Sequence, residues 1–150
     1  MKGIIDTLKD RVRESPDRII YNFLDYSTHQ PTGHQITIIM LYENAKALAA
    51  ELLDRGAKKG DRVVILSLQD PGTVYAVFGA MMAGRVFTVI PPPIDEGKVQ
   101  RFISVIKSCK PKFVISNYTL EQEQHAHDQA GHAQIDVKKQ LVRQALFQAV

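Results

Sequence analysis

The chain has 150 residues, of which 45% are hydrophobic and 23% charged, and its formal net charge is +3. These values are average for a soluble globular domain, so a largely disordered chain and a coiled coil are both excluded as the main class. A chain of this length buries roughly 70% of the surface that its unfolded form exposes, so its core needs no disulfide or metal.

The charged residues form no basic stripe. The mild excess of positive charge in the middle of the chain comes from one group, Lys98, Arg101, Lys107, Lys110 and Lys112. A solvated helix face explains this group better than a phosphate-binding patch, so we expect no nucleic-acid partner.

The single cysteine, Cys109, cannot form an internal disulfide, which favours a reduced, cytoplasmic setting. Its place at the end of an apolar helical pattern indicates a packed residue rather than a nucleophile. The long apolar stretch 74–93 is interrupted by Arg85 and by prolines, so we expect no membrane span, and the charged start of the chain does not resemble a secretory signal.

The first elements are a short helix, two extended runs that form a hairpin or a sheet-edge pair, and a long helix. The apolar period predicts a helix over 4–12 that ends before Pro16, an extended run over 19–24, a loop over 27–34 and a second extended run over 35–39. A helix follows whose apolar face is formed by Leu41, Ala45, Leu48, Ala49, Leu52 and Leu53, and Gly56 supplies its left-handed cap.

The middle of the chain alternates strands with helices. Buried strands are predicted over 63–66, 86–90 and 113–115, separated by a helix with Val74, Val77, Phe78, Met81 and Met82 on one face and a helix over 99–106. This βαβαβ order predicts an α/β fold with a partial parallel, Rossmann-like sheet flanked by helices. Gly56, Gly60 and Gly84 are assigned to turns, Asp61 to the strand entry, and 91–93 to a stiff proline connection.

The last part of the chain differs in character. Residues 121–134 are rich in Gln and His and have no apolar period, whereas Val137, Leu141, Val142, Ala145 and Leu146 outline a final amphipathic helix. No Ser/Gly linker is visible, so residues 1–150 are interpreted as a single α/β subdomain.

No metal or nucleophile site is predicted. His125, His127, Asp128 and His132 lie close together, but their spacing matches no standard zinc motif, and a solvated segment explains them better. His29 and His34 fall in the predicted loop, and we assign them no catalytic role.

A phosphate-binding loop is equally unsupported. Gly79 and Gly84 have the separation of a Walker motif, but no Lys-Ser/Thr follows them, and helix packing and capping explain both. Asp95 and Glu96 begin a helix, where negative charge is favourable. The residues alone therefore assign no catalytic, cofactor-binding or metal-binding position.

The order of the segments resembles a known family. Four segments follow one another over residues 5–118. They are RESPDRIIYNFLDY, then QITIIMLYENAKALAAELLDRGAKKGDRVVIL with its Thr-led strand, then DPGTVYAVFGAMMAGRVFTVIPPP, and last KVQRFISVIKSCKPKFVIS. This ordered set resembles the N-terminal part of adenylate-forming enzymes, and the insert FLDYSTHQPTGHQIT with the prolines after the strand is most similar to fatty-acyl-AMP ligases that load polyketide or mixed peptide synthases. Ile38 departs from the aromatic residue usual after the Thr.

The resemblance implies that ATP and Mg²⁺ activate a carboxylate, giving an acyl-adenylate that is transferred to a phosphopantetheine thiol on a carrier protein. It also implies that the chain is truncated before the family's phosphate loop, so that the fragment alone is inactive, binds no cofactor tightly and depends on the rest of the enzyme. The proline loop is a candidate for lining an acyl or pantetheine channel. Acyl-CoA synthetases, amino-acid adenylation domains, a stand-alone binding module and a flavodoxin-like nucleotide binder remain alternatives.

Overall fold

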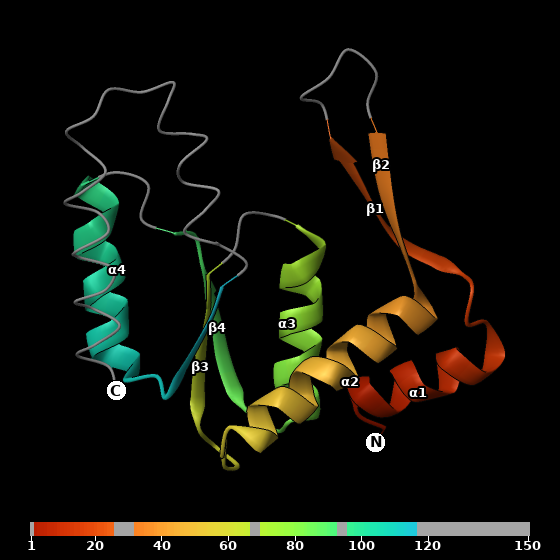
Figure 1. Ribbon diagram of the computed structural model, residues 1–150, viewed down its shortest axis with the longest axis horizontal. Helices are drawn as coiled ribbons and strands as arrows, with labels where there is room; N and C mark the ends of the chain where they lie inside the picture. The colour runs from red at the N-terminus through yellow and green to blue at the C-terminus, as the bar shows by residue number, and fades with distance from the viewer. Residues whose placement is uncertain (1, 26–31, 67–69, 93–95, 117–150) are drawn as a thin grey trace. The chain divides into compact units, whose positions relative to one another are not determined.

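The structure is a computed structural model that describes residues 2–25, 32–66, 70–92 and 96–116. Its elements, in chain order, are α1 (Ile4–Glu14), β1 (Ile19–Asp25), β2 (Thr32–Thr37), α2 (Ile38–Asp54), β3 (Arg62–Leu66), α3 (Pro71–Met82), β4 (Val86–Ile90), α4 (Glu96–Cys109) and β5 (Phe113–Ser116) (Figure 1). They fall into two compact units, Met1–Gly60 with Gln69–Val86, and Asp61–Leu68 with Phe87–Val150.

The first unit contains the predicted hairpin. β1 and β2 pair antiparallel, with Tyr21 opposite Ile36 and Leu24 opposite Gly33. The predicted loop was too long at its end, because β2 already begins at Thr32 and includes His34. Pairing with β1 makes these residues part of a strand, although Gly33 by itself disfavours one.

The start of α2 corrects a second prediction. The extended run was expected to reach residue 39, led by Thr37, but the helix begins at Ile38 and Thr37 is its N-cap. The Thr37 hydroxyl accepts a hydrogen bond from the Met40 amide at 3.3 Å. A Thr in extended backbone before a helix fits this role as well as it fits a strand.

Helices α2 and α3 pack closely within the first unit. The buried residues of α3 are Ala76, Gly79 and Ala80, whereas the larger apolar side chains predicted on one face are half-buried. Of that face, Val74, Phe78 and Met82 pack against the core cluster that includes Leu41. On α2, Leu52 is buried but Leu53 is 51% exposed, so Leu53 does not belong to the predicted face.

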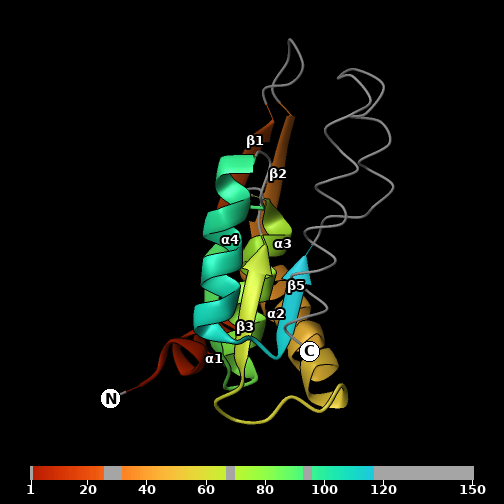
Figure 2. The same cartoon turned by 90° about the vertical axis from the view of Figure 1, so that its left-hand side faces the viewer.

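The second unit contains the sheet, in the order β4-β3-β5. β3 and β5 are parallel, with Val63 opposite Phe113 and Leu66 opposite Ser116, and Figure 2 shows their arrows side by side, with α4 next to β3. The predicted parallel α/β fold is confirmed. The helix α4 packs on this sheet through Phe102 and Ile106, which form one core cluster with Val64, Leu66 and neighbouring apolar residues.

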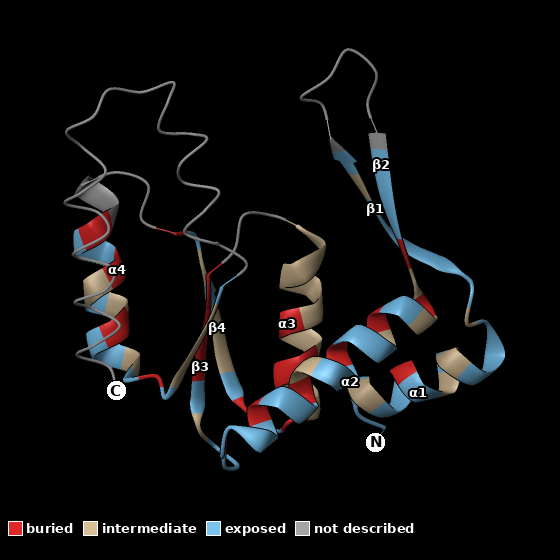
Figure 3. Ribbon diagram, viewed as in Figure 1, coloured by how far each residue is buried: buried red, intermediate tan, exposed pale blue. Residues whose placement is uncertain are grey.

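Burial differs among the three strands. All four apolar residues of β3 are buried, as predicted for a strand covered on both faces (Figure 3). β4 and β5 are less buried than predicted, because each lies at an edge of the described sheet; Val86 is 58% and Val89 43% exposed. None of the helices in the described part of the chain combines the length and apolar character that a membrane crossing requires.

Candidate functional site

The N-terminus of α2 is satisfied by its own chain. The Ile38 amide donates to the carbonyl of Arg18 at 3.0 Å, and the next amide donates to the carbonyl of Pro16 at 2.9 Å. Together with the bond from Met40 to the Thr37 hydroxyl, these contacts occupy the first three donors of the helix. The turn around Pro16 therefore caps α2, and no free donors are left there to bind a phosphate.

The N-terminus of α3 is capped in a different way. Asp70 precedes Pro71, and its carboxylate accepts from the Thr73 amide at 2.9 Å and from the Thr73 hydroxyl at 3.0 Å. A negative charge thus already occupies the position that an anionic ligand would take. The structure gives α3 a structural cap rather than a nucleotide site.

The two glycines with Walker-type separation form no loop. Gly79 lies inside α3 against α2, and a Cβ built on it would be 2.6 Å from Leu48 Cδ2 and 3.0 Å from the Ala45 carbonyl oxygen. Gly84 follows the helix with φ of +68°, and its amide donates to the Met81 carbonyl. Helix packing and capping therefore account for both glycines, as predicted.

The carboxyl ends of the strands are where ligands gather in open α/β sheets. In the part of the chain that is described, this edge is formed by Leu66, Ile90, Pro91, Pro92 and Ser116, none of which is ionisable. Pro92 is buried and Pro91 is exposed, so the predicted proline connection does follow β4 directly, whereas residue 93 lies outside the described residues. Among the described residues, this end of the sheet supplies backbone and hydroxyl groups but no charged side chain.

The opposite end of the sheet carries an ion pair. Lys112 Nζ lies 3.1 Å from the carboxylate of Asp61, and the Lys112 amide donates to the carbonyl of Arg62 at 2.9 Å. These contacts join the amino ends of β3 and β5. Asp61 therefore marks the strand entry, as predicted, through a partner that is 51 residues away and not visible in the local sequence.

Arg85 was singled out in the sequence only as an interruption of an apolar stretch. The structure buries it to 8% exposure, with Nη2 donating to the Ala57 carbonyl at 2.7 Å. Its Nε has no hydrogen-bond partner among the described residues. The guanidinium thereby joins the turn after α2 to the turn after α3.

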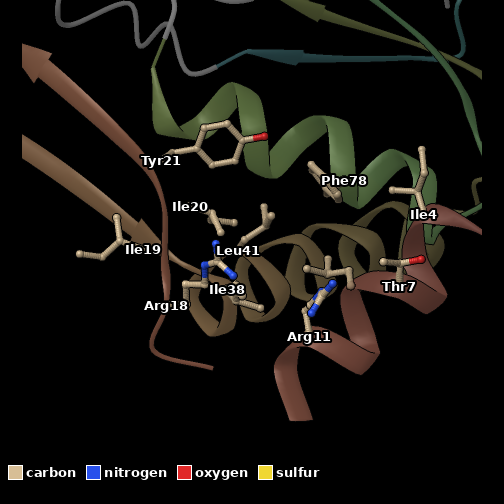
Figure 4. Close-up of a pocket in the computed structure, with 11 residues that line it drawn as sticks. Ile4, Thr7, Arg11, Arg18, Ile19, Ile20, Tyr21, Ile38, Leu41 and Phe78 are labelled. Carbon is tan, nitrogen blue, oxygen red and sulfur yellow. The ribbon is translucent and has the colours of Figure 1, made fainter. Parts of the chain in front are cut away.

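A cleft of about 570 Å³ opens in the first unit between α1, β1, α2 and α3. Its walls are mostly apolar, and Figure 4 shows side chains from all four elements converging on it. The lining residues are Ile4, Thr7, Leu8, Arg11, Arg18, Ile19, Ile20, Tyr21, Ile38, Leu41 and Phe78. Sequence reasoning missed this cleft, since its residues come from segments up to 74 positions apart.

Of the other candidate site residues, the structure describes Cys109, His34 and Glu96. Cys109 ends α4, half-buried, with its sulfur 4.0 Å from the Ile106 carbonyl, which is the packed role expected of it. His34 is exposed on β2, and Glu96 begins α4. The remaining candidates lie outside the described residues: His29, Asp95, His125, His127, Asp128 and His132. The predicted helix over 137–146 lies outside them too. No group of three potential metal ligands occurs among the residues that are described.

The amino-acid sequence is similar to those of known acid-activating enzymes. The Mycolicibacterium smegmatis long-chain-fatty-acid–AMP ligase FadD32 is 33% identical over 101 residues, covering 67% of this chain and 16% of the relative. The 4-hydroxyphenylalkanoate adenylyltransferase of Mycobacterium tuberculosis is 28% identical over 122 residues, covering 81% of this chain and 20% of the relative. The chain thus spans a fifth or less of the length of these curated relatives.

A solved structure shows the same arrangement of elements. The fatty acid AMP ligase from Legionella pneumophila matches with a TM-score of 0.70 and 29% identity, over 75% of this chain and 19% of that one. Residues 8–148 match the family described as AMP-binding enzyme, a wider range than the segments that carried the resemblance. The chain belongs to the AMP-binding enzyme family.

Proposed function

We propose that this chain is the N-terminal part of a fatty-acyl-AMP ligase. The observation that carries the proposal is the match of its fold to the Legionella pneumophila fatty acid AMP ligase, together with the similarity to FadD32. In the proposed reaction a fatty-acid carboxylate attacks the α-phosphate of ATP, the acyl–phosphate bond forms, and pyrophosphate leaves. The acyl group then passes to a phosphopantetheine thiol of a carrier protein, as in polyketide and mixed peptide synthases, and AMP is released.

The described residues contribute scaffold rather than chemistry to this reaction. Charge developing on the α-phosphate requires cationic or backbone donors and Mg²⁺. Helix N-termini could supply such donors, but those of α2 and α3 are occupied by Thr37, the Pro16 turn and Asp70. We therefore assign ATP and Mg²⁺ binding to the remainder of the enzyme. In the relatives, the part outside the match makes up four fifths or more of the protein.

The proline connection is the described segment best placed to face a substrate. Pro91 and Pro92 follow the carboxyl end of β4; the neighbouring strand β3 ends at Leu66, and β5, on the other side of β3, ends at Ser116. We assign this edge to lining the acyl or pantetheine path without a part in bond making. A cytoplasmic location fits an ATP-dependent enzyme with one cysteine.

Acyl-hydroxamate formation tests this function. The complete enzyme, given ATP, Mg²⁺, hydroxylamine and a fatty acid, is expected to form the hydroxamate in proportion to the AMP released. The 150-residue chain alone is expected to form none. Turnover by the chain alone would overturn the scaffold assignment, and a complete gene product that adenylates no fatty acid would support the alternative of a non-catalytic module.

A further inference from the structure

The cleft in the first unit joins apolar walls to positive charge. Ile4 is 62% exposed, Ile19 49% and Ile20 38%, so apolar side chains of the cleft reach solvent. A volume of about 570 Å³ falls within the range that binds small organic ligands. Exposed apolar residues that lie together mark a binding site more often than exposed apolar residues that are scattered singly over a surface.

Two guanidinium groups line the same cleft. Figure 4 shows Arg11, from α1, and Arg18, which precedes β1, on one side of the view, while Tyr21 and Phe78 lie toward the other. The Arg18 side chain makes no hydrogen bond or ion pair with the described residues, and Arg11 pairs with Glu14 at 2.8 Å. No acidic side chain is among the lining residues. The cleft therefore presents the positive charge of Arg18, with the Arg11–Glu14 pair next to it, beside an apolar surface.

We propose that this cleft binds a free acyl carboxylate, with the chain along the apolar walls and the carboxylate at Arg11 and Arg18. The charge complementarity selects an anion over a neutral or cationic head, because guanidinium groups bind carboxylates through two parallel hydrogen bonds. The four lining elements belong to one compact unit, and we propose the site as separate from the adenylating centre. This site goes beyond the proposed function, because it would be a second binding site for fatty acids, the substrate class of that reaction.

The binding of decanoate to the 150-residue chain, measured by calorimetry below its micelle concentration and without ATP, tests the site. Saturable binding near one equivalent is expected. Affinity is expected to rise about fourfold per added CH₂ from octanoate to decanoate, the increment of apolar burial. Decanol is expected to bind several-fold more weakly than decanoate, and decylamine more weakly still.

Variants assign the two halves of the site. Arg18→Gln is expected to weaken decanoate binding about threefold without affecting decanol, and the double change with Arg11→Gln brings decanoate to the level of decanol. The matched control is Arg13→Gln, on the same helix but outside the cleft, which leaves both affinities unchanged.

The apolar wall has its own variant and control. Ile20→Asp is expected to weaken both ligands tenfold or more, whereas Leu53→Asp, an exposed apolar position of α2 outside the cleft, has no effect. Circular dichroism confirms that each variant is folded.

Three results would overturn the proposal. These are no saturable decanoate binding, equal affinity in the arginine variants, and binding only to anionic phospholipid vesicles, which would indicate a membrane-facing surface instead. Because the assay contains no ATP, its failure leaves the proposed adenylation untouched, and loss of adenylation in the complete enzyme leaves this result untouched.

Discussion

Replacing Gly79 with alanine tests the contact between α2 and α3. In a helix, Gly→Ala alone stabilises by about 1 kcal/mol. Here the new Cβ would meet Leu48 Cδ2 at 2.6 Å, Leu48 Cβ at 3.0 Å and the Ala45 carbonyl oxygen at 3.0 Å. The Leu48 Cδ2 atom can rotate away, but the backbone oxygen moves only if the helices separate.

The balance of these two effects gives the expected magnitude. Overpacking in a close contact costs about 1–3 kcal/mol, and a backbone atom among the contacts places Gly79→Ala toward the upper part of that range. Subtracting the helical gain leaves a net loss of about 1–2 kcal/mol, and Gly79→Val is expected to lose about 3 kcal/mol or more. The free energy of unfolding, extrapolated from urea titration, measures both.

A matched control and a coupled variant make the experiment specific. Ala50→Val adds volume on the exposed face of α2 and is expected to change stability by less than about 0.7 kcal/mol. Leu48→Ala removes the nearest clash, so the double variant with Gly79→Ala is expected to be more stable than the sum of the single losses. A Gly79→Ala variant that is more stable than the parent would refute the close packing.

Three further predictions concern caps and charges. Asp70→Ala removes the cap of α3 and is expected to lower the free energy of unfolding by about 1 kcal/mol, whereas Asp70→Asn loses much less, as urea titration would show. Because the hydrogen bond from Lys2 lowers the pKa of the Asp10 carboxyl, Lys2→Gln is expected to raise that pKa in a carbon-detected NMR titration. The stabilisation from this carboxylate is present above its unfolded-state pKa and is lost as the pH falls through its folded-state pKa. An unchanged pKa in the variant would contradict the pairing. Arg85→Ala leaves a buried carbonyl without its donor and is expected to cost about 1–3 kcal/mol by thermal or urea unfolding, so a neutral result would exclude the buried contact.

Local signals in the sequence predict much of this fold. The run Val63–Leu66 is apolar throughout because β3 is the central strand, and a run of this kind needs no partner to be recognised. Gly56 and Gly84 end helices at positive φ, a conformation that few other residues adopt. Periodicity and turn chemistry are properties of neighbouring residues, so they are readable before the chain is folded.

The errors in the prediction have tertiary causes. The apolar period of α3 points to its large apolar residues, but the positions that are fully buried are the small ones, Ala76, Gly79 and Ala80. Val86 and Val89 look as apolar as any residue of β3, yet they lie on an edge strand. Which side of a helix or strand is covered depends on neighbours far away in sequence, so the spacing of apolar residues does not reveal it.

The candidate cleft was not predictable for the same reason. Arg11 and Arg18 look like ordinary charges on a helix and in a turn, and Phe78 like one more apolar residue of α3. Only the packing of α1 against α2, and the return of β1 beside them, bring these residues to one cavity. The resemblance to adenylate-forming enzymes identified the family, but it indicated no residue of this site.

The most direct test of the account is mass-spectrometric detection of the acyl-adenylate. The complete enzyme, with a fatty acid, ATP and Mg²⁺, is predicted to accumulate acyl-AMP and pyrophosphate in equal amounts, and the 150-residue chain is predicted to yield neither. Absence of acyl-AMP from the complete enzyme with fatty acids of every length, or its formation by this chain alone, would contradict the assignment.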